Sequence, residues 1–76
     1  MKIPLEPHDP YLRTYTEPEV TALLRELHDR GKPFGVQWAS ARVNGATVDG
    51  RLLVAFGDTS VATLLNLLEL LREASR

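Results

Sequence analysis

Cysteine is absent from the 76 residues of this sequence. Without a thiol, the chain has neither a disulfide nor a thiolate ligand for a metal ion. This matters because a single domain of this length, residues 1–76, buries only about 60% of the surface that its unfolded form exposes. A lone monomer is therefore marginally stable, and oligomerisation is the usual remedy that remains.

Neither sign of charge is in excess, because nine basic and ten acidic residues give a net charge of -1. A protein that mainly grips phosphate backbone carries a clear basic excess, so nucleic acid is not the first partner expected, although it stays open. Apolar runs of membrane-spanning length are also missing, and Met1–Pro4 has no signal-peptide pattern. We expect a soluble, cytoplasmic protein with no membrane partner.

Leucine, by contrast, is concentrated in one segment. Residues 61–74 contain no glycine or proline, and six leucines fall within eight consecutive positions, which predicts a helix. The expected cap of its first turn is Asp58 or Thr59. The leucines are Leu64, Leu65, Leu67, Leu68, Leu70 and Leu71.

The apolar arc of this helix is about 220° wide, whereas a one-sided surface helix needs little more than about 100°. We expect one side to pack in the core and the other to meet a second copy of the chain across a two-fold axis, with a different protein as the other possible partner. The side assigned to the core carries Val61, Leu64, Leu65 and Leu68. The side assigned to the homodimer interface carries Leu67, Leu70, Leu71 and Ala74.

An earlier helix is predicted after Thr16. Thr16 and Glu19 form a capping-box pattern, and Pro18 suits the first turn because its missing N–H needs no partner there. Gly31 ends the helix, and Pro33 prevents its continuation. Its single apolar face carries Val20, Leu23, Leu24 and Leu27.

Residues 35–57 predict a β-hairpin. Asn44-Gly45 is the favoured pair for a two-residue type I′ turn, with a return strand from Val48 to Phe56. Asp49-Gly50 is a second turn signal, which predicts either a bulge in the return strand or the true turn within a three-stranded meander. We favour the turn at Asn44-Gly45.

Before the first helix, residues 1–15 form a Pro-rich segment with prolines at positions 4, 7 and 10. We expect an extended arm that lies against the domain through Ile3, Leu5, Tyr11 and Tyr15, with an exposed polyproline ligand as the alternative. The predicted fold is therefore α+β, a small two-layer sandwich in the order arm-α-β-β-α. Two helices cover one face of an antiparallel β-hairpin or three-stranded sheet.

The opposite face of the sheet combines an aromatic ring with apolar and cationic side chains, and is a possible partner surface. It carries Val36, Trp38, Arg42, Arg51 and Leu53. No catalytic residue, metal site or cofactor is predicted, because no hydroxyl has an obvious base partner. His8-Asp9 and His28-Asp29 lie in different segments and are interpreted as solvated surface.

The sequence thus favours a non-enzymatic interaction or regulatory module that acts as a homodimer through its Leu-rich helix. One alternative is a nucleic-acid-binding accessory protein that uses Trp38, Arg42 and Arg51. A second alternative is a small enzyme with its site at a subunit interface. No pattern identifies a protein family.

Overall fold

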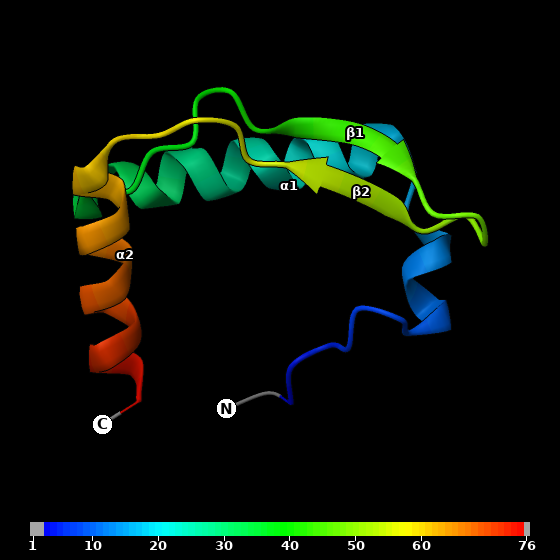
Figure 1. Ribbon diagram of the computed structural model, residues 1–76, viewed down its shortest axis with the longest axis horizontal. Coiled ribbons are helices and arrows are strands. Elements are labelled where there is room, and N and C mark those ends of the chain that lie inside the picture. The colour runs from blue at the N-terminus through cyan, green and yellow to red at the C-terminus, as the bar shows by residue number, and fades with distance from the viewer. Residues whose placement is uncertain (1–2, 76) are drawn as a thin grey trace.

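The computed structural model describes residues 3–75, which form a small α+β fold as the sequence predicts. The main elements follow the order helix, strand, strand, helix, and the two strands pair antiparallel (Figure 1). In chain order the elements are η1 (Pro10–Thr14), α1 (Glu17–Gly31), η2 (Lys32–Phe34), β1 (Arg42–Ala46), β2 (Leu52–Ala55) and α2 (Val61–Ala74), where η marks a 3-10 helix.

Helix α1 begins as its local sequence dictates. The Thr16 side chain accepts a hydrogen bond from the Glu19 backbone N–H at 3.4 Å, and the Glu19 carboxylate accepts one from the Thr16 N–H at 3.0 Å. These two bonds are the predicted capping box, which satisfies donors that the first helical turn leaves unpaired. Because Thr16 holds the Glu19 carboxylate in its charged form, the pKa of Glu19 lies below its ordinary value. Helix α1 ends at Gly31, but the expected stop there is only partly right, because the chain continues through Pro33 as the 3-10 helix η2. The left-handed glycine that ends this helical path is Gly35, with φ of 71°.

The hairpin turns at Asp49-Gly50, so the favoured turn at Asn44-Gly45 is wrong. The Gly50 N–H donates to the Thr47 carbonyl at 3.0 Å, and the Thr47 N–H donates to the Arg51 carbonyl at 2.8 Å. This is a three-residue loop closed by a glycine with φ of 93°, a conformation that side chains other than glycine rarely adopt.

Asn44-Gly45 forms a bulge in β1 instead. Val43 pairs with Val54 and Ala46 with Leu52, so two residues of β1 lie opposite a single residue of β2. Gly45 takes a φ of 80°, which permits this bulge. The glycine of each pair has a positive φ, and the pairing between the strands decides which of the two glycines lies in the turn. Since residues 36–41 lie outside β1, the sheet has two strands in the described part of the chain.

The N-terminal arm is not extended throughout. The Asp9 side chain accepts a hydrogen bond from the Tyr11 N–H at 2.9 Å, and Pro10 occupies the first turn, so residues 10–14 coil into η1. The arm still reaches the hairpin, because the Arg51 guanidinium donates to the Pro7 carbonyl. Ile3, which was expected to pin the arm, is 91% exposed.

Helix α2 begins at Val61, but its cap is Ser60 rather than Asp58 or Thr59. The Ser60 hydroxyl accepts a hydrogen bond from the Thr63 N–H at 3.2 Å. Thr59 donates to the Gln37 carbonyl at 2.5 Å instead, so its hydroxyl ties the approach to α2 to the segment after α1.

The molecule has the form of an arch. Figure 1 shows α1 and the hairpin as one layer, with α2 leaving one end and η1 the other, both toward the same side. The radius of gyration is 13.8 Å, whereas a compact chain of 76 residues has about 11 Å. We call this layer with its two projecting ends the arch.

The arch has almost no hydrophobic core. Among residues 3–75, Val36 is the single buried hydrophobic side chain, at 3% exposure. Helix α1 packs along β1, whereas α2 stands away from the sheet. The prediction that Val61, Leu64, Leu65 and Leu68 lie in the core is therefore wrong, since these side chains are 40–70% exposed. Amphipathic periodicity identifies apolar positions but not the surface that covers them.

Candidate interaction surface

One face of α2 presents a continuous apolar strip to solvent, which we call the α2 seam. Its positions follow the a, d and e spacing of a heptad, the pattern by which helices pack against one another. A strip of this spacing fits into an apolar surface over three turns of helix. The α2 seam consists of Val61 (70% exposed), Leu64 (60%), Leu65 (59%), Leu68 (40%) and Leu71 (58%).

The opposite face of α2 holds the helix to the rest of the chain. Thr63 is 2% exposed, and its hydroxyl accepts a hydrogen bond from the Gln37 N–H at 3.1 Å and donates to the Gln37 carbonyl at 3.3 Å. The Asn66 amide donates to the Gly35 carbonyl at 2.9 Å. These bonds fix the base of α2, the turns around Thr63 and Asn66, against residues 35–37.

The predicted homodimer interface is divided between these two faces. Leu67 and Leu70 are half-buried on the same side as Thr63 and Asn66, whereas Leu71 belongs to the α2 seam. Ala74 is exposed near the end of the helix. The helix does have two distinct sides, but the exposed one is centred on residues that the sequence assigned to the core.

Sequence analysis missed Thr63 and Asn66 as anchors of α2. The signal was present, since a threonine and an asparagine three residues apart interrupt the leucines on one side of the wheel. Short polar side chains bond easily to a nearby backbone, and here they pair with carbonyl and N–H groups of another segment.

A second apolar surface lies beneath the sheet at the opposite end of the arch, and we call it the arm cleft. It is an open hollow of about 280 Å³ between the arm, α1 and β2. Among the described residues, every side chain that lines it is aliphatic apart from the Tyr15 phenol. The lining residues are Leu5, Leu12, Tyr15, Val20, Leu23, Leu52 and Val54.

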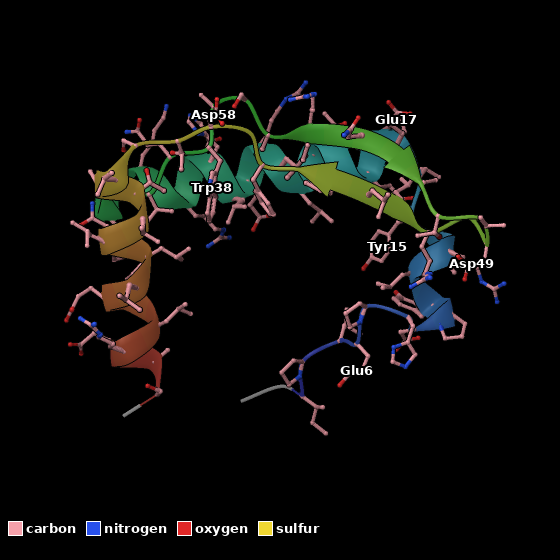
Figure 2. The ribbon with its side chains drawn as sticks, viewed as in Figure 1. Glu6, Tyr15, Glu17, Trp38, Asp49 and Asp58 are labelled. Carbon is pink, nitrogen blue, oxygen red and sulfur yellow. The ribbon has the colours of Figure 1, made fainter. Side chains whose placement is uncertain are left out.

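Tyr15 marks the inner wall of the arm cleft, and Figure 2 shows it below the hairpin. Its ring meets that of Tyr11 edge to face, with centroids 5.8 Å apart. The neighbouring Tyr11 raises the pKa of Tyr15 above its ordinary value. This aromatic contact joins η1 to its own C-cap residue, and Leu5 (60%) and Leu23 (51%) remain largely exposed in the same cleft.

A third hollow, of about 440 Å³, lies between α1 and the segment that leads into β1. Arg25 and Arg42 line it together with Glu17 and Asp29, so its ionisable groups have no dominant sign. His28 also lines it, with a buried Nδ1 that has no hydrogen-bond partner within residues 3–75. The mixed charges give no preference for a phosphate or for a metal cation.

The structure does not assemble the partner surface predicted on the sheet. Val36 is buried and does not belong to any exposed face. Trp38 packs on Phe56, with ring centroids 5.0 Å apart, at the α2 end of the layer (Figure 2). Arg51 pairs with Asp49 at 3.0 Å in the turn, at the other end.

Arg42 opens β1 and donates to the Ser40 carbonyl at 3.3 Å, beside the hollow that Trp38 also lines. Leu53 is 48% exposed on β2. The five predicted residues are therefore spread over the whole layer, and Trp38, Arg42 and Arg51 do not form one stacking platform.

Within residues 3–75, no group of three or more His, Asp or Glu side chains is arranged to hold a metal ion. In the same part of the chain, neither α-helix is long and apolar enough to cross a membrane. Comparison with protein-family models, with curated proteins and with solved structures finds no match to this chain. The α2 seam and the arm cleft are thus the features on which a functional proposal can rest.

Proposed function

We propose that this protein is a small non-enzymatic interaction or regulatory module that acts as a homodimer, with α2 as its assembly element. The observation that carries the proposal is the α2 seam, in which five successive a, d and e positions hold aliphatic side chains that are 40–70% exposed. Contiguous apolar surface of this kind marks a protein–protein contact, because left uncovered it promotes aggregation.

The exposed area of the whole chain supports the same proposal. The single chain exposes 6180 Å², whereas a compact monomer of 8.5 kDa exposes about 4,700 Å². The excess of about 1,500 Å² exceeds the roughly 800 Å² that each partner buries in a standard interface and falls in the range of obligate dimers. A second copy that covers this area supplies the core that one copy lacks.

The alternatives and the compartment remain predictions. No contact favours a nucleic-acid platform, since Trp38 packs on Phe56 and Arg51 is engaged by Asp49 and Pro7. No catalytic arrangement supports the enzyme alternative within the described residues. The predicted cytoplasmic location rests on the sequence alone.

The test compares two single charge insertions on α2. Leu68→Glu places a carboxylate in the α2 seam, whereas Ala62→Glu places one on the exposed stripe that also carries Glu69. In sedimentation velocity over a range of concentrations, we expect the unmodified protein and Ala62→Glu to sediment as dimers. Leu68→Glu should sediment as a monomer, because burying an unpaired charge in the interface is costly.

Circular dichroism of each variant supplies the control for folding. The homodimer is contradicted if the unmodified protein stays monomeric at high micromolar concentration. If the Leu68→Glu variant remains dimeric, the α2 seam is not the dimer interface, although the homodimer itself stands.

A further inference from the structure

We infer that the α2 seam of each copy occupies the arm cleft of the other, so that two copies exchange α2 reciprocally. This inference rests on the proposed homodimer and names the surface that receives the helix. A simpler arrangement is that the two α2 helices pair with each other. The experiment must distinguish reciprocal exchange from this pairing.

The first step is that α2 is held away from its own cleft. Thr63 and Asn66 bond to residues 35–37, at the end of α1 from which α2 departs. The arm cleft lies at the opposite end of the arch, between η1 and the turn end of the hairpin. Since polar bonds at its base keep α2 in this direction, its own seam and its own cleft do not meet.

The second step is that the two surfaces have matching chemistry. The seam is entirely aliphatic, and the arm cleft is aliphatic except for the Tyr15 phenol. Bringing them together buries no ionised side chain, so no charge has to be desolvated. At about 280 Å³ and open to solvent, the cleft lies below the usual range of roughly 300–1,000 Å³ for small-molecule sites. Leucine side chains from a helix suit such a shallow hollow.

The two arrangements also differ in how much apolar surface they cover. Pairing of α2 with α2 covers the seam alone and leaves Leu5, Leu23 and Val54 of the cleft exposed. Reciprocal exchange covers seam and cleft together, twice per dimer, and closes under a two-fold axis. It therefore accounts better for an excess exposed area of about 1,500 Å² than helix pairing does.

The experiment uses the absence of cysteine, which makes any introduced thiol unique. Leu23→Cys labels the cleft, and Leu64→Cys, Leu65→Cys and Leu68→Cys label the seam in three separate variants, so that at least one thiol pair is within disulfide reach. Each seam variant, isotope-labelled, is mixed with unlabelled Leu23→Cys, dissociated, reassembled and oxidised. Mass spectrometry then distinguishes mixed from like-with-like dimers. Ala62→Cys on the polar stripe is the matched control.

Reciprocal exchange predicts mixed disulfide dimers from at least one seam variant and none from Ala62→Cys. Efficient like-with-like cross-linking of the seam variants, without mixed dimers, overturns the exchange but leaves the homodimer standing. The chain carrying Leu23→Cys and Leu68→Cys together should oxidise to a covalent dimer, and a monomer with an internal disulfide also overturns the exchange. Absence of any cross-link from a protein that sediments as a monomer removes both proposals.

A measurement on the unmodified protein guards against variants that fail to fold. In a dimer reassembled from isotope-labelled and unlabelled chains, isotope-filtered NOE spectra report contacts between copies only. We expect cross-peaks from the Tyr15 ring to leucine methyl groups of α2. A dimer that shows leucine-to-leucine contacts between copies without contacts to Tyr15 contradicts the exchange.

Discussion

The hydroxyl of Thr63 accepts a hydrogen bond from the backbone N–H of Gln37 and returns one to the carbonyl of the same residue, at 3.1 and 3.3 Å. Twenty-six residues of sequence separate the two. The Thr63 side of this reciprocal pair is buried, at 2% exposure, whereas Gln37 is exposed. It joins α2 to residues 35–37, the segment that follows η2, and it sets the direction in which α2 leaves the layer.

Thr63→Val should therefore destabilise the protein at nearly constant side-chain shape. The substitution removes the acceptor of the Gln37 N–H, whereas the Gln37 carbonyl keeps its hydrogen bond from Thr59, and the loss of a partly buried hydrogen bond costs about 1 kcal/mol. Urea unfolding followed by circular dichroism measures this difference. Thr14→Val is the control, because the exposed Thr14 hydroxyl donates to the nearby Tyr11 carbonyl, and its loss should stay within about 0.5 kcal/mol. Equal effects of the two substitutions would mean that Thr63 is not an anchor.

The location of the turn is open to a direct test. Gly50 closes the loop with φ of 93°, and an added Cβ there would meet no atom within 4 Å, so only the backbone conformation resists substitution. Gly50→Ala should destabilise the protein by about 1–2 kcal/mol. Val48→Thr, at the fully exposed loop tip, should change stability by less than about 0.5 kcal/mol. If Gly50→Ala is as stable as the unmodified protein, the chain does not reverse at this position.

Local sequence accounted for the start of α1, because its cap and its first-turn proline are signals within a few residues, whereas the stop expected at Gly31 and Pro33 continues into η2. The sequence predicted a hairpin but not the position of its turn, because Asn44-Gly45 and Asp49-Gly50 are both compatible with one. The pairing between the two strands determines that the turn lies at Asp49-Gly50. The direction of α2 could not be deduced, because Thr63 and Asn66 act through residues 35–37, which are distant in sequence. Periodicity alone could not have revealed that partner.

Acid should weaken the protein through two carboxyl groups. The Thr47 hydroxyl and the Arg51 guanidinium hold the pKa of Asp49 below its ordinary value of 3.8, and Thr16 holds the pKa of Glu19 below its ordinary 4.5. A depressed folded-state pKa stabilises the folded protein above the ordinary value, and this contribution is lost as the pH falls through the depressed pKa. The melting temperature should thus be constant near neutral pH and begin to fall below about pH 4.5.

The variant with Glu19→Gln and Asp49→Asn together provides the comparison for the acid effect. Its melting temperature should be lower than that of the unmodified protein at neutral pH, and the two curves should approach each other in acid. Curves that remain parallel from neutral to acidic pH would show that these two carboxyl groups do not carry the dependence.

Removal of the N-terminal arm should destabilise the protein. The Arg51 guanidinium donates to the Pro7 carbonyl, and Leu5 lines the arm cleft, so the segment before η1 contributes to the layer although much of it is exposed. Deletion of residues 1–9 should lower the melting temperature by at least about 4 °C, which corresponds to roughly 1 kcal/mol for a domain of this size. Differential scanning calorimetry at fixed protein concentration measures the shift. Ile3→Ser is the matched control, since Ile3 is 91% exposed and should change the melting temperature little. An unchanged melting curve after the deletion, with rapid amide exchange in residues 3–9 of the intact chain, would mean that the arm does not pack and would favour the exposed polyproline alternative.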